Sequence, residues 1–381
     1  MTTLLIGTLG VISSWDYPTS VIFLALCIIF TIVRSYQTFQ YASDSAWRQL
    51  ALFIVVIIPG SFLLYNPFYA GFSRSGMGIE WVGAQTTALS AFLIVFGFFL
   101  WVILGYLLLL FSRLHISLKA WIAPWATAIA TVGCWVIIHR WFDRDYATLL
   151  FSLYLVALSG YLLFKSQFFT PYSRQSDRSN PYVILCLIYA CLITVGCDIV
   201  FVQDFLQGGE YKRMNTIFKF YLPAWYFLAI VAAYAVYTLW QHAKQSPRFP
   251  NVVVARCFLG FAAILFIMSA VFPIASSYSR RHSDFYRRYT VGPTLNGLAF
   301  LALKNIDEYQ VIRWLNEHVS GMPVILEAVH DDYKYDYARI SANTGLPTVL
   351  GWPSHADQRE HWGKTHQRRR DVTDIYATTD A

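Results

Sequence analysis

The sequence predicts an α-helical polytopic membrane protein, and three observations lead to this fold class. Of its 381 residues, 56% are hydrophobic and only 13% are charged, about half the charged fraction of a soluble globular domain. The apolar residues gather in blocks of about 17–25 residues, the length that a helix needs to cross the hydrocarbon core of a bilayer. Polar and turn-forming residues separate these blocks.

The apolar blocks define about eight full spans and a shorter first one. Met1–Ser13 lacks the positive start and the small-residue cleavage site of a signal peptide, so we interpret it as a helix that begins upstream. Residues 1–275 are therefore expected to form one transmembrane helical domain of about eight or nine helices. The full spans are Pro18–Val33, Leu50–Tyr65, Thr87–Phe111, Lys119–His139, Ala147–Phe164, Pro181–Phe201, Lys219–Trp240 and Val252–Ala275.

The composition changes after the last span, so residues 276–381 are expected to form a separate segment. Ser276–Arg288 is polar and lacks a long apolar run. Glu308–Val319 has helical spacing, whereas Pro323–Ala328 and Leu346–Leu350 are predicted as short strands. A helix followed by strands suggests an α/β domain, and roughly 90 polar-rich residues make too thin a core to complete it.

The distribution of Lys and Arg predicts the orientation. One set of alternating loops, with residues such as Arg34, Arg113 and Lys165, carries more positive charge than the set that contains Arg140 and Lys212. The positive-inside rule puts the first set in the cytoplasm. The second set and the C-terminal segment are then expected outside the plasma membrane. This topology explains most of the net charge of +7 and argues against a nucleic-acid partner.

A charged segment, Gly208–Tyr221, lies between two apolar spans. Such groups are costly beside hydrocarbon unless they are paired or face a polar cavity. Cationic side chains at a helix start can hold a phosphate group, Arg by bidentate hydrogen bonds, and helix N-terminal amides add to the attraction. Snorkelling interface residues, paired with Glu210 and lipid headgroups, are the alternative interpretation. The candidate phosphate ligands are Lys212, Arg213, Asn215 and Lys219.

Three carboxylates are candidate catalytic residues: Asp16, Asp198 and Glu210. Asp16 stands two residues before Pro18, where it would cap a helix, bind a metal or position an acceptor. Asp198 lies inside an apolar span, and an intramembrane carboxylate marks a functional candidate. We expect Asp198 to pair with Arg213 or Lys219, and the sequence leaves open whether such a pair is structural or catalytic.

Several aromatic residues are candidate sugar contacts. Trp15 and Tyr17 flank Asp16, where their rings would stack on a sugar or join an interfacial aromatic belt. Trp352 and His355, with Arg359 nearby, are expected near the outer opening of the membrane domain. The alternating Tyr333, Tyr335 and Tyr337 fit a half-buried strand or a sugar-binding face. The Gly-rich segment Asn66–Gln85, which contains Arg74 and Glu80, fits a mobile outer loop or an ordinary connector.

No metal site is predicted. The six cysteines all fall inside apolar spans without metal or redox spacing, so we interpret them as small buried hydrophobes. Glu327, His330, Asp331, Asp332 and His355 in the C-terminal segment match no known metal-binding spacing.

Three blocks resemble a known family. They are Trp15–Thr19 (WDYPT), Arg213–Tyr221 (RMNTIFKFY) and Arg339–Trp352, which contains TGLPTVLGW. In this order they resemble the YYY-type membrane-protein family of Chloroflexi, other bacteria and archaea. The resemblance implies a GT-C-like fold, that of multi-span glycosyltransferases that move a sugar from a polyprenyl-phosphate donor on the outer membrane face.

The chain also departs from that family. Family members carry an acidic outer loop upstream of WDYPT and continue past Asp380, and their His-Glu pair is His355-Ala356 here. The resemblance therefore implies a fragment, truncated at both ends, that lacks the catalytic carboxylate loop. A divalent metal such as Mg²⁺ or Mn²⁺ is implied only for the full-length protein.

The sequence thus leads to a membrane glycosyltransferase-like protein whose partners are the lipid bilayer and a lipid-linked sugar phosphate. A transporter or flippase of an anionic lipid-linked substrate is the main alternative, although no inverted repeat is found in the sequence. A non-catalytic membrane assembly component is the third hypothesis.

Overall fold

A computed structural model describes most of the chain. The described residues are 1–13, 15–38, 43–71, 78–83, 85–114, 122–139, 145–168, 180–203, 209–245, 249–284, 288, 292, 294–332, 334, 336–357 and 362–378. Arg74, Tyr333, Tyr335, Arg359 and the side chain of Glu210 lie outside this description. The chain forms two compact units. The membrane unit comprises Met1–Ala70 and Met77–Met268, and the C-terminal unit comprises Gly71–Gly76 and Ser269–Ala381.

The protein is a polytopic helical membrane protein, because each apolar block of the sequence forms a helix. Within the described ranges, six helices are long and apolar enough to cross a membrane. They are α2 (Asp16–Thr38), α6 (Leu89–Arg113), α8 (Ala147–Phe168), α9 (Asn180–Ile199), α10 (Met214–Gln245) and α11 (Phe249–Arg281). The other helices of this unit are α1 (Thr2–Ile12), α3 (Ser43–Leu52), the π-helical η1 (Phe53–Ile57), α4 (Ile58–Leu64), α5 (Asn66–Gly71) and α7 (Ile122–His139).

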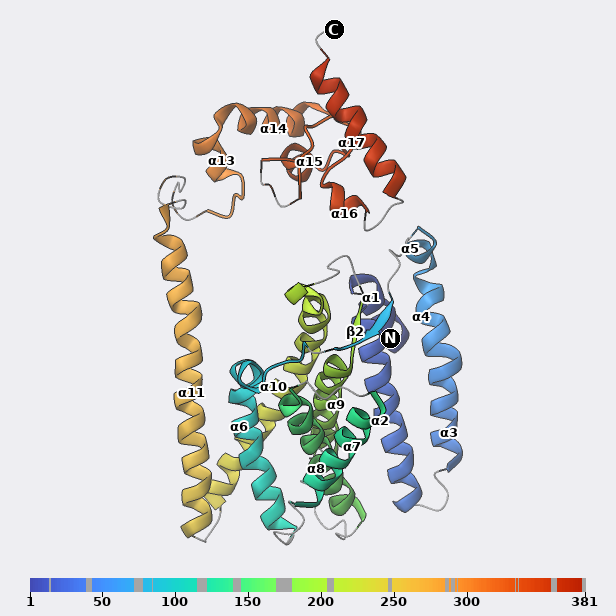
Figure 1. Cartoon of the computed structure of the whole chain (residues 1–381), viewed down its shortest axis with the longest axis vertical. Coiled ribbons are helices and arrows are strands. Elements are labelled where there is room, and N and C mark those ends of the chain that lie inside the picture. Colours follow the sequence, from blue (N-terminus) through green and yellow to red (C-terminus); the bar gives the residue numbers. More distant parts are fainter. Residues whose placement is uncertain are drawn as a thin grey trace. The chain divides into compact units, whose positions relative to one another are not determined.

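The core of the membrane unit lies between α6, α8, α9 and α10. Helix α9 packs against both α8 and α10, and α10 also packs against α6 (Figure 1). The side chains of Phe96, Tyr106, Leu158, Leu187 and Leu228 are almost completely buried there. Aromatic residues from different helices meet in this core, as in the tilted pair of Phe96 and Tyr221, whose ring centroids are 5.2 Å apart.

A glycine lets α6 approach its neighbours closely. A Cβ atom at Gly105 would lie 2.8 Å from Cδ1 of Phe258 on α11 and 3.1 Å from Cδ1 of Leu239 on α10. We expect Gly105→Ala to lower the free energy of unfolding by about 1–3 kcal/mol, because an extra methyl group overpacks a filled interface. Gly196→Ala is the matched control, since a Cβ there meets no atom within 4 Å.

The measurement for this pair is chemical unfolding of the full chain in detergent micelles, followed by circular dichroism. Equal stability of the Gly105→Ala and Gly196→Ala proteins would show that the contacts of α6 with α10 and α11 accommodate the extra methyl group without loss of stability.

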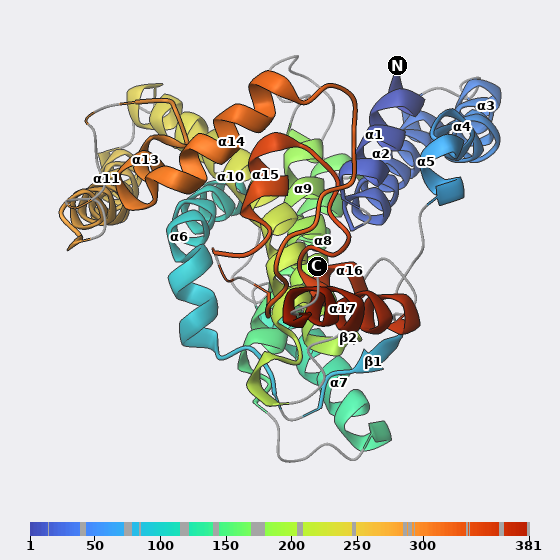
Figure 2. The same ribbon diagram turned by 90° about the horizontal axis from the view of Figure 1, so that it is seen from above.

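The N-terminal helices of the membrane unit pack as a group. Helix α1 contacts α2 and α4, and α2 contacts α3, so α1 to α4 lie together when the molecule is seen from above (Figure 2). Hydroxyl groups join them. Tyr17 on α2 lies 2.9 Å from the Ser61 hydroxyl on α4, and Thr8 on α1 lies 2.5 Å from the hydroxyl of Tyr65.

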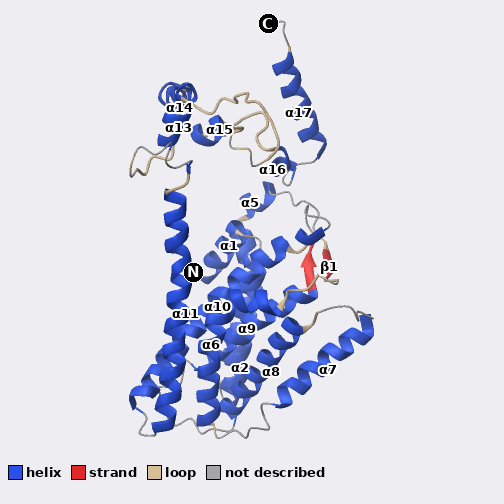
Figure 3. Ribbon diagram, turned by 60° about the vertical axis from the view of Figure 1, so that its left-hand side comes forward, coloured by secondary structure: helices blue, strands red, loops and turns tan. Residues whose placement is uncertain are grey.

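Several expected helix boundaries differ in the structure, and α11 continues to Arg281 instead of ending at Ala275. The span predicted to continue through Phe201 ends as a helix at Ile199, because β2 (Val200–Val202) pairs antiparallel with β1 (Ile79–Trp81). These strands stand out in red among the helices of Figure 3. The Asn66–Gln85 segment, predicted as a loop, accordingly contains α5 and β1. Helix α10 begins at Met214, so Lys219 lies in its second turn instead of at its start.

The C-terminal unit is a small assembly of short helices. The two segments predicted as strands meet only in a parallel bridge between Ile325 and Thr348. Asn305 caps α14 by accepting a hydrogen bond from the amide of Glu308. Leu301, Ile312 and Val372 are buried between the helices. These helices are α13 (Ala299–Lys304), α14 (Ile306–His318), α15 (Arg339–Thr344), α16 (Pro353–Asp357) and α17 (Trp362–Ala377).

Candidate functional site

A buried ion pair lies at the start of α10. The Nη2 atom of Arg213 is 2.8 Å from Oδ1 of Asp198, and the two side chains are only 7% and 2% exposed. Asp198 is in the last turn of α9, and Arg213 directly precedes α10. The structure thus pairs Asp198 with Arg213 and not with Lys219. A buried ion pair of this kind is stable only when further hydrogen bonds satisfy both charged groups.

Thr87 supplies much of that hydrogen bonding on the Asp198 side. Its hydroxyl donates to Oδ1 of Asp198 at 2.9 Å, and its amide N–H does so at 3.3 Å. The Thr87 carbonyl accepts a hydrogen bond from the Thr148 hydroxyl at 2.7 Å. The hydroxyl of Tyr221 on α10 donates to the Thr87 hydroxyl at 3.3 Å. Thr87 and Arg213 therefore meet the end of α9 at one carboxylate, and Thr148 and Tyr221 hold Thr87 in place.

Arg213 also binds two backbone carbonyl groups. Its Nη1 donates to the carbonyl oxygen of Gln85, and its Nη2 donates to that of Cys197. The guanidinium group therefore links the segment before α6, the end of α9 and the start of α10. Its buried Nε has no hydrogen-bond partner among the described residues. An unsatisfied buried donor is costly, and it marks a place where a ligand or a water molecule would be stabilised.

A cavity of about 290 Å³ adjoins this ion pair. Lys212 and Arg213 both line it, with Gln85 and Phe201. The Nζ atom of Lys212 is 3.3 Å from Oε2 of Glu80 on β1, and these side chains are 40% and 41% exposed. The same ammonium group lies 4.8 Å from the centroid of the Phe201 ring. The two adjacent cations therefore differ: Arg213 is fixed and buried, whereas Lys212 is partly exposed and held by a weak ion pair.

Trp15 contacts α10 at Phe220, the residue next to Lys219. The Trp15 ring makes an edge contact with the Phe220 ring, with centroids 5.7 Å apart. Lys219 is partly exposed, and its ammonium group makes no hydrogen bond or ion pair with the other described residues. Asn215 is partly exposed in the first turn of α10. Tyr17 points its hydroxyl to Ser61 on α4, so its phenol oxygen is engaged inside the protein.

The other two catalytic candidates lie on different elements. Asp16 is the first residue of α2 and is partly exposed, where its charge favours the helix N-terminus. Glu210 is within the short 3₁₀ helix η4 (Gly209–Tyr211). A catalytic role for either residue stays a prediction.

The acidic residues of the C-terminal unit have structural partners. Asp332 accepts the backbone N–H groups of Ser354 at 3.0 Å and His355 at 2.9 Å, at the start of α16. The His355 ring lies beside that of Trp352, with centroids 5.5 Å apart. Among the residues that the structure describes, no group of three or more His, Cys, Asp or Glu side chains could hold a metal ion. We therefore assign no step to Mg²⁺ or Mn²⁺.

Sequence reasoning missed Gln85, Thr87 and Phe201 at this site. Thr87 was expected only as the first residue of a span, and Phe201 as the last residue of another. Neither position has a pattern that predicts the contact of Thr87 with Arg213 or of Phe201 with Lys212, because these contacts depend on how α6, α9 and α10 pack.

Comparison with known proteins agrees with the membrane-protein architecture. A family described as an uncharacterized membrane protein (DUF2298) matches residues 1–228, which include the ion pair and the cavity beside Lys212. No curated protein and no solved structure matches the chain. Because the match covers more than half of the 381 residues, the chain belongs to the DUF2298 family of membrane proteins.

Proposed function

We propose that this protein is a GT-C-like membrane glycosyltransferase whose cavity beside Lys212 binds the phosphate group of a polyprenyl-phosphate sugar. One observation carries the proposal: Lys212 and Arg213 line the same 290 Å³ cavity, and the buried Nε atom of Arg213 has no hydrogen-bond partner among the described residues. The likeness of the RMNTIFKFY and TGLPTVLGW blocks to the YYY-type family supports the reaction class. The cavity and the C-terminal unit would then face the outer side of the plasma membrane, as the positive-inside rule predicts.

Lys212 is the residue that would contact the phosphate directly. Its ion pair with Glu80 is about two fifths exposed on both sides, and pairs of this kind stabilise a protein by only about 0–1 kcal/mol. A phosphate group carries more negative charge and more acceptor oxygens than one carboxylate, so it would replace Glu80 beside the ammonium group. Arg213 would add a fixed positive charge from the wall of the cavity.

The remaining candidates fit around this donor site. Lys219 would extend the positive charge toward Trp15, and Asn215 would add an amide hydrogen bond. Asp198 would orient Arg213 instead of acting as a base, because its Oδ1 already accepts three hydrogen bonds. Asp16, at the start of α2, stays a candidate for the carboxylate that accepts a proton from an acceptor hydroxyl. Trp352 and His355 stay candidates for acceptor contacts.

The test compares lipid binding to the full chain in nanodiscs by native mass spectrometry. The probes are undecaprenyl phosphate and the neutral lipid undecaprenol. We expect Lys212→Gln to weaken binding of the phosphate lipid by about tenfold or more, because a charge-assisted hydrogen bond is lost. Lys244→Gln is the matched control, since Lys244 also lies over an aromatic ring, 4.4 Å from the centroid of Trp240, in the last turn of α10.

Equal loss in both lysine variants, or equal binding of the two lipids, would contradict the donor site. Lipid movement across the bilayer without sugar transfer would instead favour the flippase alternative.

A further inference from the structure

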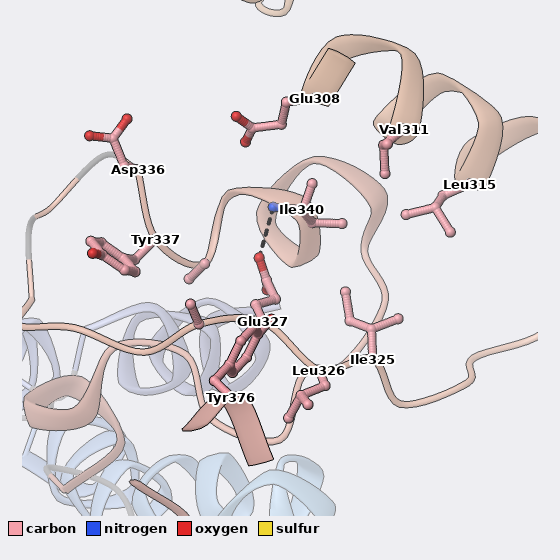
Figure 4. A pocket seen from close by; sticks show the side chains of 12 residues that line it. Glu308, Val311, Leu315, Ile325, Leu326, Glu327, Asp336, Tyr337, Ile340 and Tyr376 are labelled. Atoms are coloured by element: carbon pink, nitrogen blue, oxygen red, sulfur yellow. Dashed lines mark hydrogen bonds between the residues drawn. The ribbon is translucent and has the colours of Figure 1, made fainter. Parts of the chain in front are cut away.

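A second cavity lies inside the C-terminal unit, between α14, the segment around Ile325 and the start of α15. Its volume is about 440 Å³, within the roughly 300–1,000 Å³ typical of small-molecule sites. Figure 4 shows two different sides. The carboxylates of Glu308 and Asp336 lie on one side, and the aliphatic side chains of Val311 and Leu315 lie on the other.

The carboxylates on the polar side of this cavity are paired with cations that do not themselves line it. The Nε atom of Arg339 donates to Oε1 of Glu308, and its Nη2 lies 3.2 Å from Oδ1 of Asp336. The ammonium group of Lys304 is 3.5 Å from that same oxygen atom. The charged groups that line the cavity are therefore carboxylates, and the Asp336 side chain is still 54% exposed.

Glu327 fixes the shape of the cavity. Glu327 is 8% exposed. Its carboxylate accepts hydrogen bonds from the backbone N–H groups of Ile340 at 3.0 Å and Ser341 at 3.2 Å. Ala338, which also lines the cavity, has the left-handed backbone conformation with φ 57°. A non-glycine residue adopts this conformation at a cost of roughly 1 kcal/mol, which the contacts of Glu327 offset.

The apolar side offers flat and aliphatic surface. Ile325, Leu326 and the rings of Tyr337 and Tyr376 line it together with the α14 residues. Tyr376 is 58% exposed, so its ring is accessible to a ligand. Burial of apolar C–H groups against such side chains is favourable.

We infer that this cavity binds a neutral sugar. A cationic ligand would compete with Arg339 and Lys304, which already pair with Glu308 and Asp336, and an anionic ligand would meet Glu308, Glu327 and Asp336. A sugar hydroxyl donates a hydrogen bond without bringing a charge, so it matches a wall whose charged groups are paired carboxylates. The C–H face of the sugar ring would pack on Tyr376 and the aliphatic side chains.

In this arrangement Asp336 accepts hydrogen bonds from hydroxyl groups of the sugar, while Tyr376 supplies the packing surface. Neither residue belongs to the lipid-phosphate cavity, which lies in the membrane unit. The inference therefore stands without the proposed donor site, and it adds a binding site for a carbohydrate that carries no phosphate.

The experiment uses saturation-transfer NMR on the full chain in detergent micelles. The probes are maltose and cellobiose, with the β-1,4-linked glucosamine dimer and cellobiouronate as charged disaccharides of similar shape. We expect saturation transfer to at least one neutral disaccharide, with little transfer to either charged sugar. Tyr376→Ala is expected to weaken binding by about tenfold through loss of the ring surface, and Asp336→Asn to weaken it through loss of a charged acceptor.

Ile375→Ala is the matched control. Ile375 adjoins Tyr376 on α17 and is similarly exposed at 56%, but it does not line the cavity. Its substitution should leave sugar binding unchanged. The inference is overturned if neither disaccharide binds, if a charged sugar binds more tightly, or if Tyr376→Ala and Ile375→Ala have the same effect. Binding of undecaprenyl phosphate is expected to survive Tyr376→Ala, so the two sites can fail separately.

Discussion

Asp198→Ala is expected to lower the free energy of unfolding by about 3–5 kcal/mol, the largest effect that we predict for the membrane unit. The substitution leaves the Arg213 guanidinium group buried without its counter-ion, since that side chain is only 7% exposed. It also removes the acceptor of the Thr87 hydroxyl and amide hydrogen bonds. Unfolding in detergent, followed by circular dichroism and by tryptophan fluorescence, measures the loss.

A double substitution distinguishes the loss of the ion pair from the cost of leaving one buried charge without a partner. Asp198→Leu combined with Arg213→Met removes both charges and fills a similar volume, so we expect it to recover most of the stability. Glu80→Gln is the control, because it breaks the exposed pair with Lys212 and should change stability by less than about 1 kcal/mol. If Asp198→Ala and Glu80→Gln are equally mild, the buried pair does not hold α9 and α10 together.

Glu327→Ala is expected to destabilise the C-terminal unit by about 3 kcal/mol, because two hydrogen bonds to a charged acceptor are lost at once. The amides of Ile340 and Ser341 at the start of α15 lose their acceptor. Glu327→Gln should cost less, since a neutral amide keeps one acceptor oxygen. Hydrogen exchange of the full chain, read on peptides that contain residues 339–344, reports this local effect directly.

Glu317→Ala is the control for that experiment. Glu317 pairs with Arg313 at 2.7 Å, but both side chains are more than half exposed. The hydrogen bond from Arg313 lowers the pKa of Glu317, yet solvent replaces that interaction once it is broken. Exchange at residues 339–344 should stay unchanged in this variant. Faster exchange there in Glu317→Ala, or none in Glu327→Ala, would contradict the role given to Glu327.

The membrane class and the set of helices could be predicted from the sequence. Long apolar blocks dictate both, because a backbone inside hydrocarbon must satisfy its own hydrogen bonds as a helix. The ends of the helices were less accessible to prediction. Helix α9 ends at Ile199 because Val200–Val202 pairs with a strand more than a hundred residues earlier in the chain, and hydropathy is the same for either structure.

Local sequence also identified Asp198, Arg213 and Lys212 as unusual, since charged residues at a membrane boundary are costly unless they have partners. The sequence by itself determined that these charges need oppositely charged or hydrogen-bonding partners. Only the tertiary structure decided how each is compensated: Arg213 by Asp198 and two carbonyl groups, Lys212 by Glu80 beside an open cavity. The apolar composition around each charged residue sets the free-energy cost of burying its charge. The partners that offset this cost come from segments that meet only when the helices pack.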